Sequence, residues 1–354
     1  MTLENLGYNI NLENYYKNNK NLSSFEIGRV ISEHRERYIV KTIDNEFDAE
    51  IIGNLRFSAK NRYDFPAVGD WVAISEFDKN KAIIYVIFPR KTILDRQAVG
   101  KSGEKQIIAT NIDYAFIVQA IDNDFNINRI ERYLTICNAS KVEPIIILSK
   151  VDLIGKQDLD RILEKLQKRV KNISIITVSS ETQDGYKELK SIIKKGKTYC
   201  LLGSSGVGKS TLLNNISDKE LMKTNSISLS SKKGRHITTH RELIVLETGG
   251  IIIDNPGMRE IGIADISNGL EITYDEITKL SQNCRFKDCS HIHEKGCAII
   301  EALDNGIIDK ASYDNYLKME IEKKHFVSSV AEKRQKDKDF GKMYKNFKNN
   351  KHKY

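Results

Sequence analysis

Gly203-Ser204-Ser205-Gly206-Val207-Gly208-Lys209-Ser210 is the stretch that decides how this chain folds, and it fits the pattern G-x-x-x-x-G-K-[ST]. An apolar segment, residues 198–202, comes directly before it, and a segment with helical character begins at Thr211. A glycine-rich loop between a buried strand and a helix lets backbone N–H groups converge on phosphate oxygens. The stretch therefore predicts a phosphate-binding loop within an α/β domain.

The side chains that end this loop indicate a nucleotide bound together with a metal ion. Lys209 neutralises the β- and γ-phosphates, and the hydroxyl of Ser210 is a ligand for Mg²⁺. The backbone up to Thr211 supplies the remaining predicted contacts. A flexible Gly/Ser turn is the alternative interpretation, and the loop by itself does not separate GTP from ATP.

A base-recognition motif follows a second apolar segment, residues 144–148, and reads Ser149-Lys150-Val151-Asp152. It resembles the N-K-x-D motif of GTPases, in which the Asp carboxylate accepts hydrogen bonds from the guanine N1–H and exocyclic amine. Adenine lacks donors in that arrangement, so Asp152 predicts selectivity for GTP, while Lys150 lies along the base plane. Ser149 stands where the motif has Asn, so we expect the amide contact to the base to be lost or shortened. Residues 177–181 resemble the loop that backs the base.

A third motif, D-x-x-G, ends another apolar segment, residues 250–253, and reads Asp254-Asn255-Pro256-Gly257. Asp254 is predicted to reach Mg²⁺ through water, and the N–H of Gly257 to sense the γ-phosphate. A simple N-P-G turn is the alternative. Base recognition precedes the phosphate loop here, whereas it normally comes after D-x-x-G. The sequence therefore predicts a circularly permuted G domain, in which nucleotide state is transmitted to the part of the chain beyond Gly257.

The rest of the chain divides around this domain. We expect a flexible N-terminus over residues 1–22 and an all-β barrel over 23–100, built from short strands separated by turn residues. An OB-fold is the favoured barrel and an SH3-like barrel the alternative. Alternating strands and helices predict the α/β P-loop domain over 101–264, with a parallel sheet. A mainly α zinc-binding domain over 265–332 and a basic tail over 333–354 complete the prediction.

Three of the five cysteines crowd into one short stretch, and the odd count argues against a disulfide framework. Cys284, Cys289, His291 and Cys297 offer three thiolates and one imidazole, a set suited to tetrahedral Zn²⁺. His293 is a substitute ligand with less favourable spacing, and buried thiols beside surface histidines are the alternative. Four protein ligands leave no open position, which predicts one structural zinc ion.

The formal net charge of +8 is unevenly distributed, because residues 333–354 hold nine Lys or Arg and only two Asp. Such a tail favours contact with a polyanion, although a solvated, disordered C-terminus has the same composition. No apolar run approaches the roughly 20 residues that span a bilayer, and the N-terminus does not resemble a signal peptide. We therefore expect a cytoplasmic protein without membrane contact.

These motifs together resemble the RsgA (YjeQ/YloQ) family of bacterial ribosome-assembly GTPases, over about residues 25–320. The resemblance includes Val68-Gly69-Asp70-Trp71-Val72, Gly234-Arg235-His236-Ile237-Thr238-Thr239, which is close to the family's G-R-H-T-T-T switch, and Tyr313-x₂-Tyr316. It implies a monomeric GTPase that binds GTP and GDP, associates with the 30S ribosomal subunit and 16S rRNA during late maturation, is stimulated by the subunit, and then leaves. The barrel and the zinc domain are implied to contact rRNA.

The resemblance also implies where catalysis takes place. Met258 occupies the position at which many GTPases carry a water-positioning Gln, and an apolar side chain cannot orient water. His236 is the catalytic candidate carried over from the family, together with Lys209, and Thr238 is the candidate contact for Mg²⁺ and the γ-phosphate. A GTP-regulated RNA-binding module without a dedicated role in ribosome assembly and an ATP-using P-loop enzyme are the two other functional classes. Asp152, as a residue selective for guanine, disfavours the ATP-using enzyme.

Overall fold

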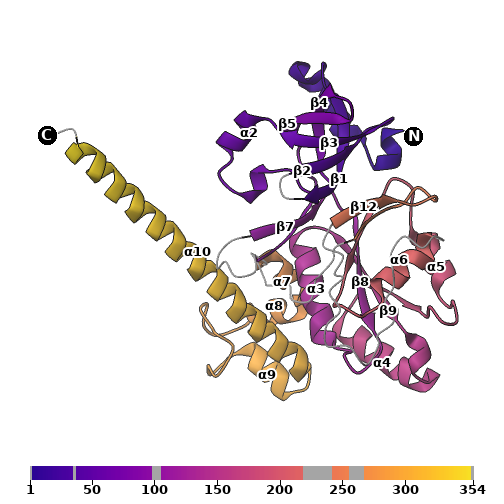
Figure 1. Cartoon of the computed structure of the whole chain (residues 1–354). Coiled ribbons are helices and arrows are strands. Elements are labelled where there is room, and N and C mark those ends of the chain that lie inside the picture. The colour runs from indigo at the N-terminus through magenta and orange to yellow at the C-terminus, as the bar shows by residue number, and fades with distance from the viewer. Residues whose placement is uncertain (1, 35–36, 98–104, 218–240, 255–266, 352–354) are drawn as a thin grey trace, which may run out of the picture. The chain divides into compact units, whose positions relative to one another are not determined.

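The computed structural model describes residues 2–34, 37–97, 105–217, 241–254 and 267–351 (Figure 1). The chain divides into two compact units, one of residues 1–94 and 107–260 and the other of residues 95–106 and 261–354. Within the described ranges, no helix has both the length and the apolar character needed to cross a bilayer.

The first unit begins with a closed five-stranded barrel. Its strands are β1 (Glu26–His34), β2 (Arg37–Lys41), β3 (Glu46–Ile51), β4 (Trp71–Asp78) and β5 (Lys81–Ile87). They pair in the order β1-β2-β3-β5-β4, β4 pairs back with β1, and only the β3–β5 pair is parallel. Along β3 the side chains alternate between solvent and core, with Phe47, Ala49 and Ile51 inside. Closure of five strands in this order agrees with the expected OB-type barrel.

The N-terminal segment differs from the flexible segment that we expected over residues 1–22. It forms η1 (Leu3–Leu6), α1 (Ile10–Asn18) and η2 (Lys20–Leu22). Leu6, Leu12 and Leu22 are buried against Trp71 and Phe88 of the barrel. The Asn-rich composition that suggests mobility includes Asn9, whose side chain accepts two backbone N–H groups and caps α1.

The second part of this unit is a sheet whose four central strands are almost wholly buried. It contains β8 (Tyr114–Ala120), β9 (Glu143–Ser149), β10 (Ser174–Val178), β11 (Thr198–Leu202), β12 (Arg241–Val245) and β13 (Ile251–Asp254). The order is β10-β9-β8-β11-β13-β12, and all pairs are parallel except β12–β13. Helices α3 (Ile127–Ala139), α4 (Lys156–Arg169), α5 (Tyr186–Ile192) and α6 (Lys209–Ser217) connect or follow the strands.

This strand order gathers the predicted nucleotide motifs. The strand before the phosphate loop, β11, lies between β8 and β13, and β9 lies beyond β8. Parallel strands have their carboxyl ends on the same edge of a sheet, which is where α/β domains bind ligands. The carboxyl ends of β9, β11 and β13 therefore share one edge, although the chain reaches them in permuted order.

Arg29 of β1 fastens the barrel to this sheet. Its side chain is buried, with 1% of its surface exposed. The guanidinium donates to the carbonyl oxygens of Leu6 at 2.5 Å, Gly69 at 3.2 Å and Asn111 at 3.2 Å, and to the Thr198 hydroxyl at 3.0 Å. One side chain thus joins the N-terminal segment, the barrel and the strand that leads to the phosphate loop.

The second unit is mainly helical. It contains α7 (Ser267–Thr273), α8 (Asp275–Ser281), α9 (Ala298–Asp304) and α10 (Lys310–Lys351). Helix α10 begins in the expected zinc-binding domain and continues through most of the basic tail. Two strands that we did not predict, β6 (Ile93–Gln97) and β7 (Lys105–Thr110), form a separate two-stranded sheet.

We expect Arg29→Met to lower the free energy of unfolding by about 3 kcal/mol or more, because four acceptors each lose a hydrogen bond from a buried guanidinium while the apolar stem is kept. Arg37→Met is the matched control, since that side chain is 66% exposed and its nearest carboxylates lie at 3.8 and 3.9 Å. Urea unfolding monitored by Trp71 fluorescence measures both. An equal decrease in the free energy of unfolding in the two variants would show that the hydrogen bonds of Arg29 do not specifically stabilise the junction.

Candidate nucleotide site and metal centre

The phosphate loop lies between β11 and α6 and depends on three glycines. Gly203, Gly206 and Gly208 have φ angles of 150°, 86° and 92°, which side chains rarely tolerate. A Cβ at Gly203 would lie 2.4 Å from the carbonyl oxygen of Val118 on β8, so only glycine fits there. Val207 is buried in the core of the sheet and anchors the middle of the loop.

The charge of Lys209 is held within this loop. Its Nζ donates to the carbonyl oxygens of Gly203 at 2.8 Å and Ser204 at 2.5 Å. Burial lowers the pKa of Lys209 to about 8, and the negative charge of Asp254 opposes that shift. An ammonium group destabilised by burial gains from an anion beside it, so the loop is electrostatically suited to phosphate. Ser210 and Thr211 follow in the first turn of α6.

Tyr133 supports the loop from α3 and was not identified from the sequence. Its side chain is buried and forms a hydrogen bond with the hydroxyl of Ser204, while desolvation raises the pKa of Tyr133. The available signal was its helical spacing from Ile130 and Leu134, which are also buried. That spacing indicates a core position and gives no indication of the contact with the loop.

Ser149 connects the base-recognition segment to the phosphate loop. Its side chain is buried at the end of β9, and its Oγ donates to the carbonyl oxygen of Val207 at 2.7 Å. We expected this residue to matter through a lost or shortened contact with the base. The structure instead gives its hydroxyl a partner inside the phosphate loop, so the two loops lie in contact.

Asp152 is oriented by a neighbouring loop. The Ser179 hydroxyl, which is buried, donates to Asp152 Oδ1 at 2.5 Å and accepts from the Thr182 N–H at 3.1 Å. The Asp152 side chain is otherwise exposed. Lys150 adopts a positive φ of 60°, and its Nζ lies 3.1 Å from Asp122 Oδ2. Residues 177–181, expected behind the base, therefore do reach the carboxylate proposed to read it.

Asp254 completes the described part of the site. It ends β13 with 6% of its surface exposed, and it interacts electrostatically with Lys209. A carboxylate beside the lysine of a phosphate loop is suited to hold Mg²⁺ with the Ser210 hydroxyl. Gly257, His236, Thr238 and Met258 lie outside the residues that the structure describes.

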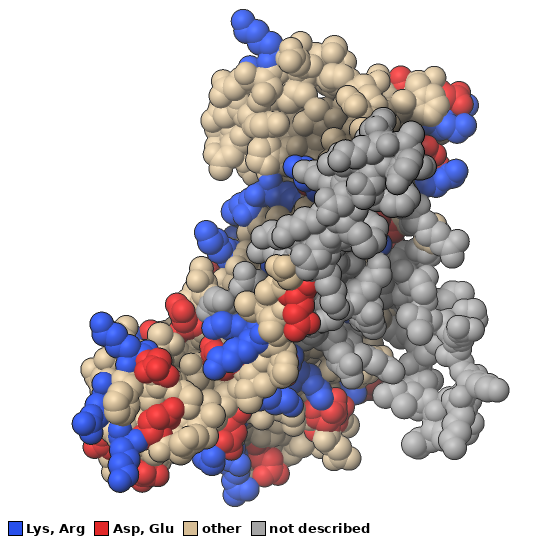
Figure 2. All heavy atoms as spheres, turned by 90° about the vertical axis from the view of Figure 1, so that its left-hand side faces the viewer, with Lys and Arg blue, Asp and Glu red and all other residues tan. Residues whose placement is uncertain are grey.

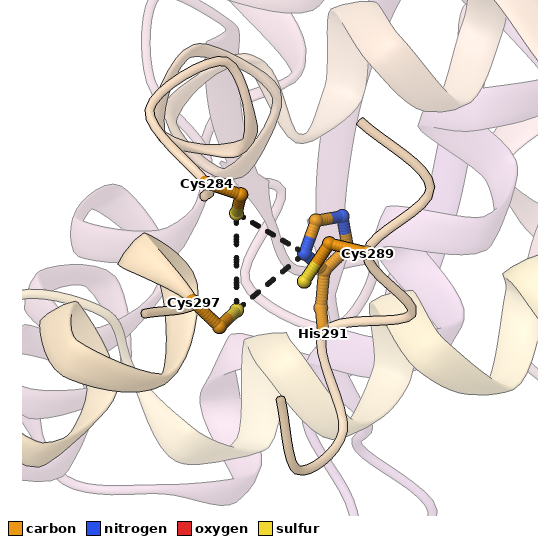
Figure 3. Close-up of side chains that lie close together, drawn as sticks. All are labelled: Cys284, Cys289, His291 and Cys297. Atoms are coloured by element: carbon orange, nitrogen blue, oxygen red, sulfur yellow. Dashed lines mark hydrogen bonds between the residues drawn. The ribbon is translucent and has the colours of Figure 1, made fainter. Parts of the chain in front are cut away.

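The second unit brings Cys284, Cys289, His291 and Cys297 together (Figure 3). Their ligand atoms all lie within 4.8 Å of one another. The Sγ atoms of Cys284 and Cys297 are 3.9 Å apart, and they lie 3.5 and 3.6 Å from His291 Nδ1. Tetrahedral zinc with ordinary bond lengths requires about 3.8 Å between sulfurs and about 3.6 Å from sulfur to nitrogen. The cluster is therefore spaced to hold a metal ion such as zinc.

Glu294 fixes the loop that carries His291. Its carboxylate accepts the N–H groups of Ser290 at 2.9 Å, Ile292 at 3.1 Å and His293 at 3.2 Å, and also the Ser290 hydroxyl. These bonds hold the pKa of Glu294 far below its ordinary value. The phenol of Tyr313 on α10 donates to the carbonyl oxygen of His291 at 2.5 Å. His293 is exposed and does not join the cluster.

Comparison with known proteins gives consistent matches. The family model described as "RsgA GTPase" matches residues 87–264, and the model described as "50S ribosome-binding GTPase" matches residues 198–331. "Small ribosomal subunit biogenesis GTPase RsgA 1" of Bacteroides thetaiotaomicron is 39% identical over 326 residues, covering 92% of this chain and 90% of that protein. "Small ribosomal subunit biogenesis GTPase RsgA 2" of Listeria monocytogenes is 41% identical over 323 residues, covering 91% and 89%.

Two solved structures share the fold. The crystal structure of YjeQ from Thermotoga maritima has a TM-score of 0.62 and 26% identity, and the match covers 84% of this chain and 98% of that one. The crystal structure of YloQ, described as a circularly permuted GTPase, has a TM-score of 0.61 and 24% identity, with 86% and 97% covered. The predicted fold class, with its permuted G domain, is thus confirmed.

We expect Ser149→Ala to raise the Kd values of GTP and GDP by the same factor, about five- to tenfold, because one buried hydrogen bond between the two loops is lost. Ser191→Ala is the control, since its hydroxyl is exposed on α5 and bonds only within that helix. Titration with a fluorescent guanine nucleotide measures the affinities. Wild-type affinity, or a change in preference for guanine over adenine, would contradict the assigned role; the latter outcome is expected for Asp152→Asn.

Proposed function

The chain belongs to the RsgA GTPase family and is a GTP hydrolase, and we propose that it acts in the late maturation of the small (30S) ribosomal subunit by binding the subunit and its 16S rRNA. The observation that carries the GTP assignment is the contact between the two loops, Ser149 with Val207 at 2.7 Å, which supports a shared site for Asp152 and Lys209. The subunit assignment rests on the names of relatives that match nine-tenths of the chain.

In the proposed mechanism, the backbone N–H groups of the loop and Lys209 hold the triphosphate, and Asp152, oriented by Ser179, selects guanine. Ser210 and Asp254 are the residues proposed to hold Mg²⁺, which neutralises charge on the β- and γ-phosphate oxygens when it is bound. Gly257 is proposed to sense the γ-phosphate, Thr238 to contact it, and His236 to orient the attacking water.

The charge distribution supports a ribosomal partner. On the face shown in Figure 2, the described Lys and Arg side chains are interspersed with Asp and Glu, and neither sign forms a continuous field. Seven of the eight net positive charges belong to residues 333–354. A basic end on a nearly neutral body is suited to the phosphates of RNA, and the proposed site of action is the cytoplasm.

We also propose that Cys284, Cys289, His291 and Cys297 hold one structural zinc ion. Their spacing matches tetrahedral coordination, and no ligand position remains open for catalysis once all four bind. Zinc would then stabilise the loop between α8 and α9, in which few side chains are buried.

Added 30S subunits are expected to raise the rate of GTP hydrolysis at least tenfold, because binding to the subunit is proposed to trigger hydrolysis and release of the protein. Added 50S subunits are the control arm, since one matching family model is described as 50S-binding. Phosphate release under single-turnover conditions measures the rate. Stimulation by 50S but not by 30S would overturn the small-subunit assignment. If 30S gives no stimulation but pelleting shows nucleotide-dependent binding to unrelated RNA, a general RNA-binding module is supported instead.

His291→Ala is expected to lose the metal and to lower the thermal midpoint of the second unit, because a three-ligand site binds zinc far more weakly. His293→Ala, two positions away and exposed, is expected to retain one zinc per chain. Metal content by inductively coupled plasma mass spectrometry distinguishes them. Equal zinc in both variants would exclude His291 as a ligand.

A further inference from the structure

Three residues from three strands lie in one row between the nucleotide site and the barrel. In the β12–β13 pair, Glu242 is directly opposite Asp254, and in the β1–β12 pair, the same Glu242 is opposite Ser32. Figure 1 shows β12 close to the base of the barrel. Neighbouring strands are about 4.8 Å apart, so the carboxylate proposed to hold Mg²⁺ is only two strand spacings from β1.

The pairing of Glu242 with Asp254 sets two like charges against each other. Residues directly opposite on antiparallel strands place their side chains on the same face, and like charges there destabilise the pairing. Asp254 also acts electrostatically on Lys209 of the phosphate loop. The end of β12 that meets the barrel therefore carries the like-charge pair.

The β1–β12 pairing is also short in the described part of the chain. It consists of Ser32 with Glu242 and Glu33 with Arg241, and it begins beside an irregularity in β1 between Val30 and Ser32. At the other end of the contact, Val245 packs against the cluster that contains Trp71, and Arg29 holds Thr198. The barrel is thus fixed at the Arg29 junction and joined through a weak pairing at Glu242.

We propose that Glu242 couples the nucleotide site to the barrel. This inference rests on the proposed GTP and Mg²⁺ binding at Asp254. A divalent cation, when it is bound at Asp254, would offset the negative charge that faces Glu242, which would tighten the start of β12 and close its pairing with β1. Loss of the γ-phosphate and its cation weakens the same pairing and loosens the barrel about the Arg29 junction.

Coupling of this kind is reciprocal. A ligand of the barrel that favours the closed β1–β12 pairing must raise the affinity for GTP by the factor by which GTP raises the affinity for that ligand. The permuted order of the motifs predicts that nucleotide state is transmitted through Gly257 towards the C-terminal region. The row of Asp254, Glu242 and Ser32 would transmit it to the N-terminal barrel instead.

Hydrogen exchange of the full chain measured by mass spectrometry tests the proposal. In wild-type protein, a non-hydrolysable GTP analogue with Mg²⁺ is expected to slow exchange in peptides that cover residues 30–34 and 241–245 by about two- to fivefold, the effect of removing one like-charge cross-strand pair. Peptides around Gly69 and Asn111, which bond to Arg29, are expected to stay unchanged. Mg²⁺ without nucleotide is the control.

The variant Glu242→Gln separates this coupling from nucleotide binding. It removes the like charge, so slow exchange in β1 and β12 is expected already without nucleotide, and the nucleotide-dependent difference is expected to vanish. Glu76→Gln on β4, an exposed carboxylate opposite Ala82, is the matched control and should behave as wild type.

Wild-type exchange that does not respond to bound analogue, or E242Q exchange identical to wild type, would overturn the proposal. Analogue binding is followed by fluorescence in the same samples, so failure to bind guanine nucleotide would refute the GTPase assignment separately. The nucleotide-free comparison of E242Q with wild type needs no ligand and reports on the repulsion alone.

Discussion

The hydrogen bond from Ser149 to the carbonyl oxygen of Val207 is the contact on which the nucleotide site depends. It joins two loops that are 58 residues apart in the chain and brings together the residue proposed to read the base and those proposed to hold the phosphates. The order of the motifs along the chain is permuted, yet the site needs only that β9, β11 and β13 end on one edge of the sheet. Permutation therefore leaves the arrangement of the site unchanged. It alters only which parts of the chain precede and follow the strands that form the site.

Much of the fold follows from local patterns. Fully apolar runs such as Leu201 and its neighbours on β11 predict buried parallel strands, and the phosphate loop is predicted by glycines whose backbone angles other residues avoid. The metal cluster is predicted because ligand spacing in a short segment limits its geometry. These signals lie within a few residues of one another, so the sequence alone carries them.

The features that escaped prediction depend on contacts between distant residues. Arg29 looks like an outward-facing residue of a strand, and its partners Leu6, Asn111 and Thr198 come from separate parts of the chain. The N-terminal helices are stabilised by burial against the barrel and not by their own composition. Ser149 departs from the base-recognition motif, and only the position of Val207 shows which group its hydroxyl contacts. Tyr133 likewise reads as an ordinary core residue of a helix.

The central claim is that one guanine nucleotide contacts both loops, and a crystal structure with a non-hydrolysable GTP analogue and Mg²⁺ tests it most directly. The account predicts the guanine N1 within about 3 Å of the Asp152 carboxylate and a β- or γ-phosphate oxygen within about 3 Å of Lys209 Nζ, in the same molecule. A nucleotide bound through the phosphate loop with its base turned away from Asp152, or bound elsewhere on the protein, would contradict it.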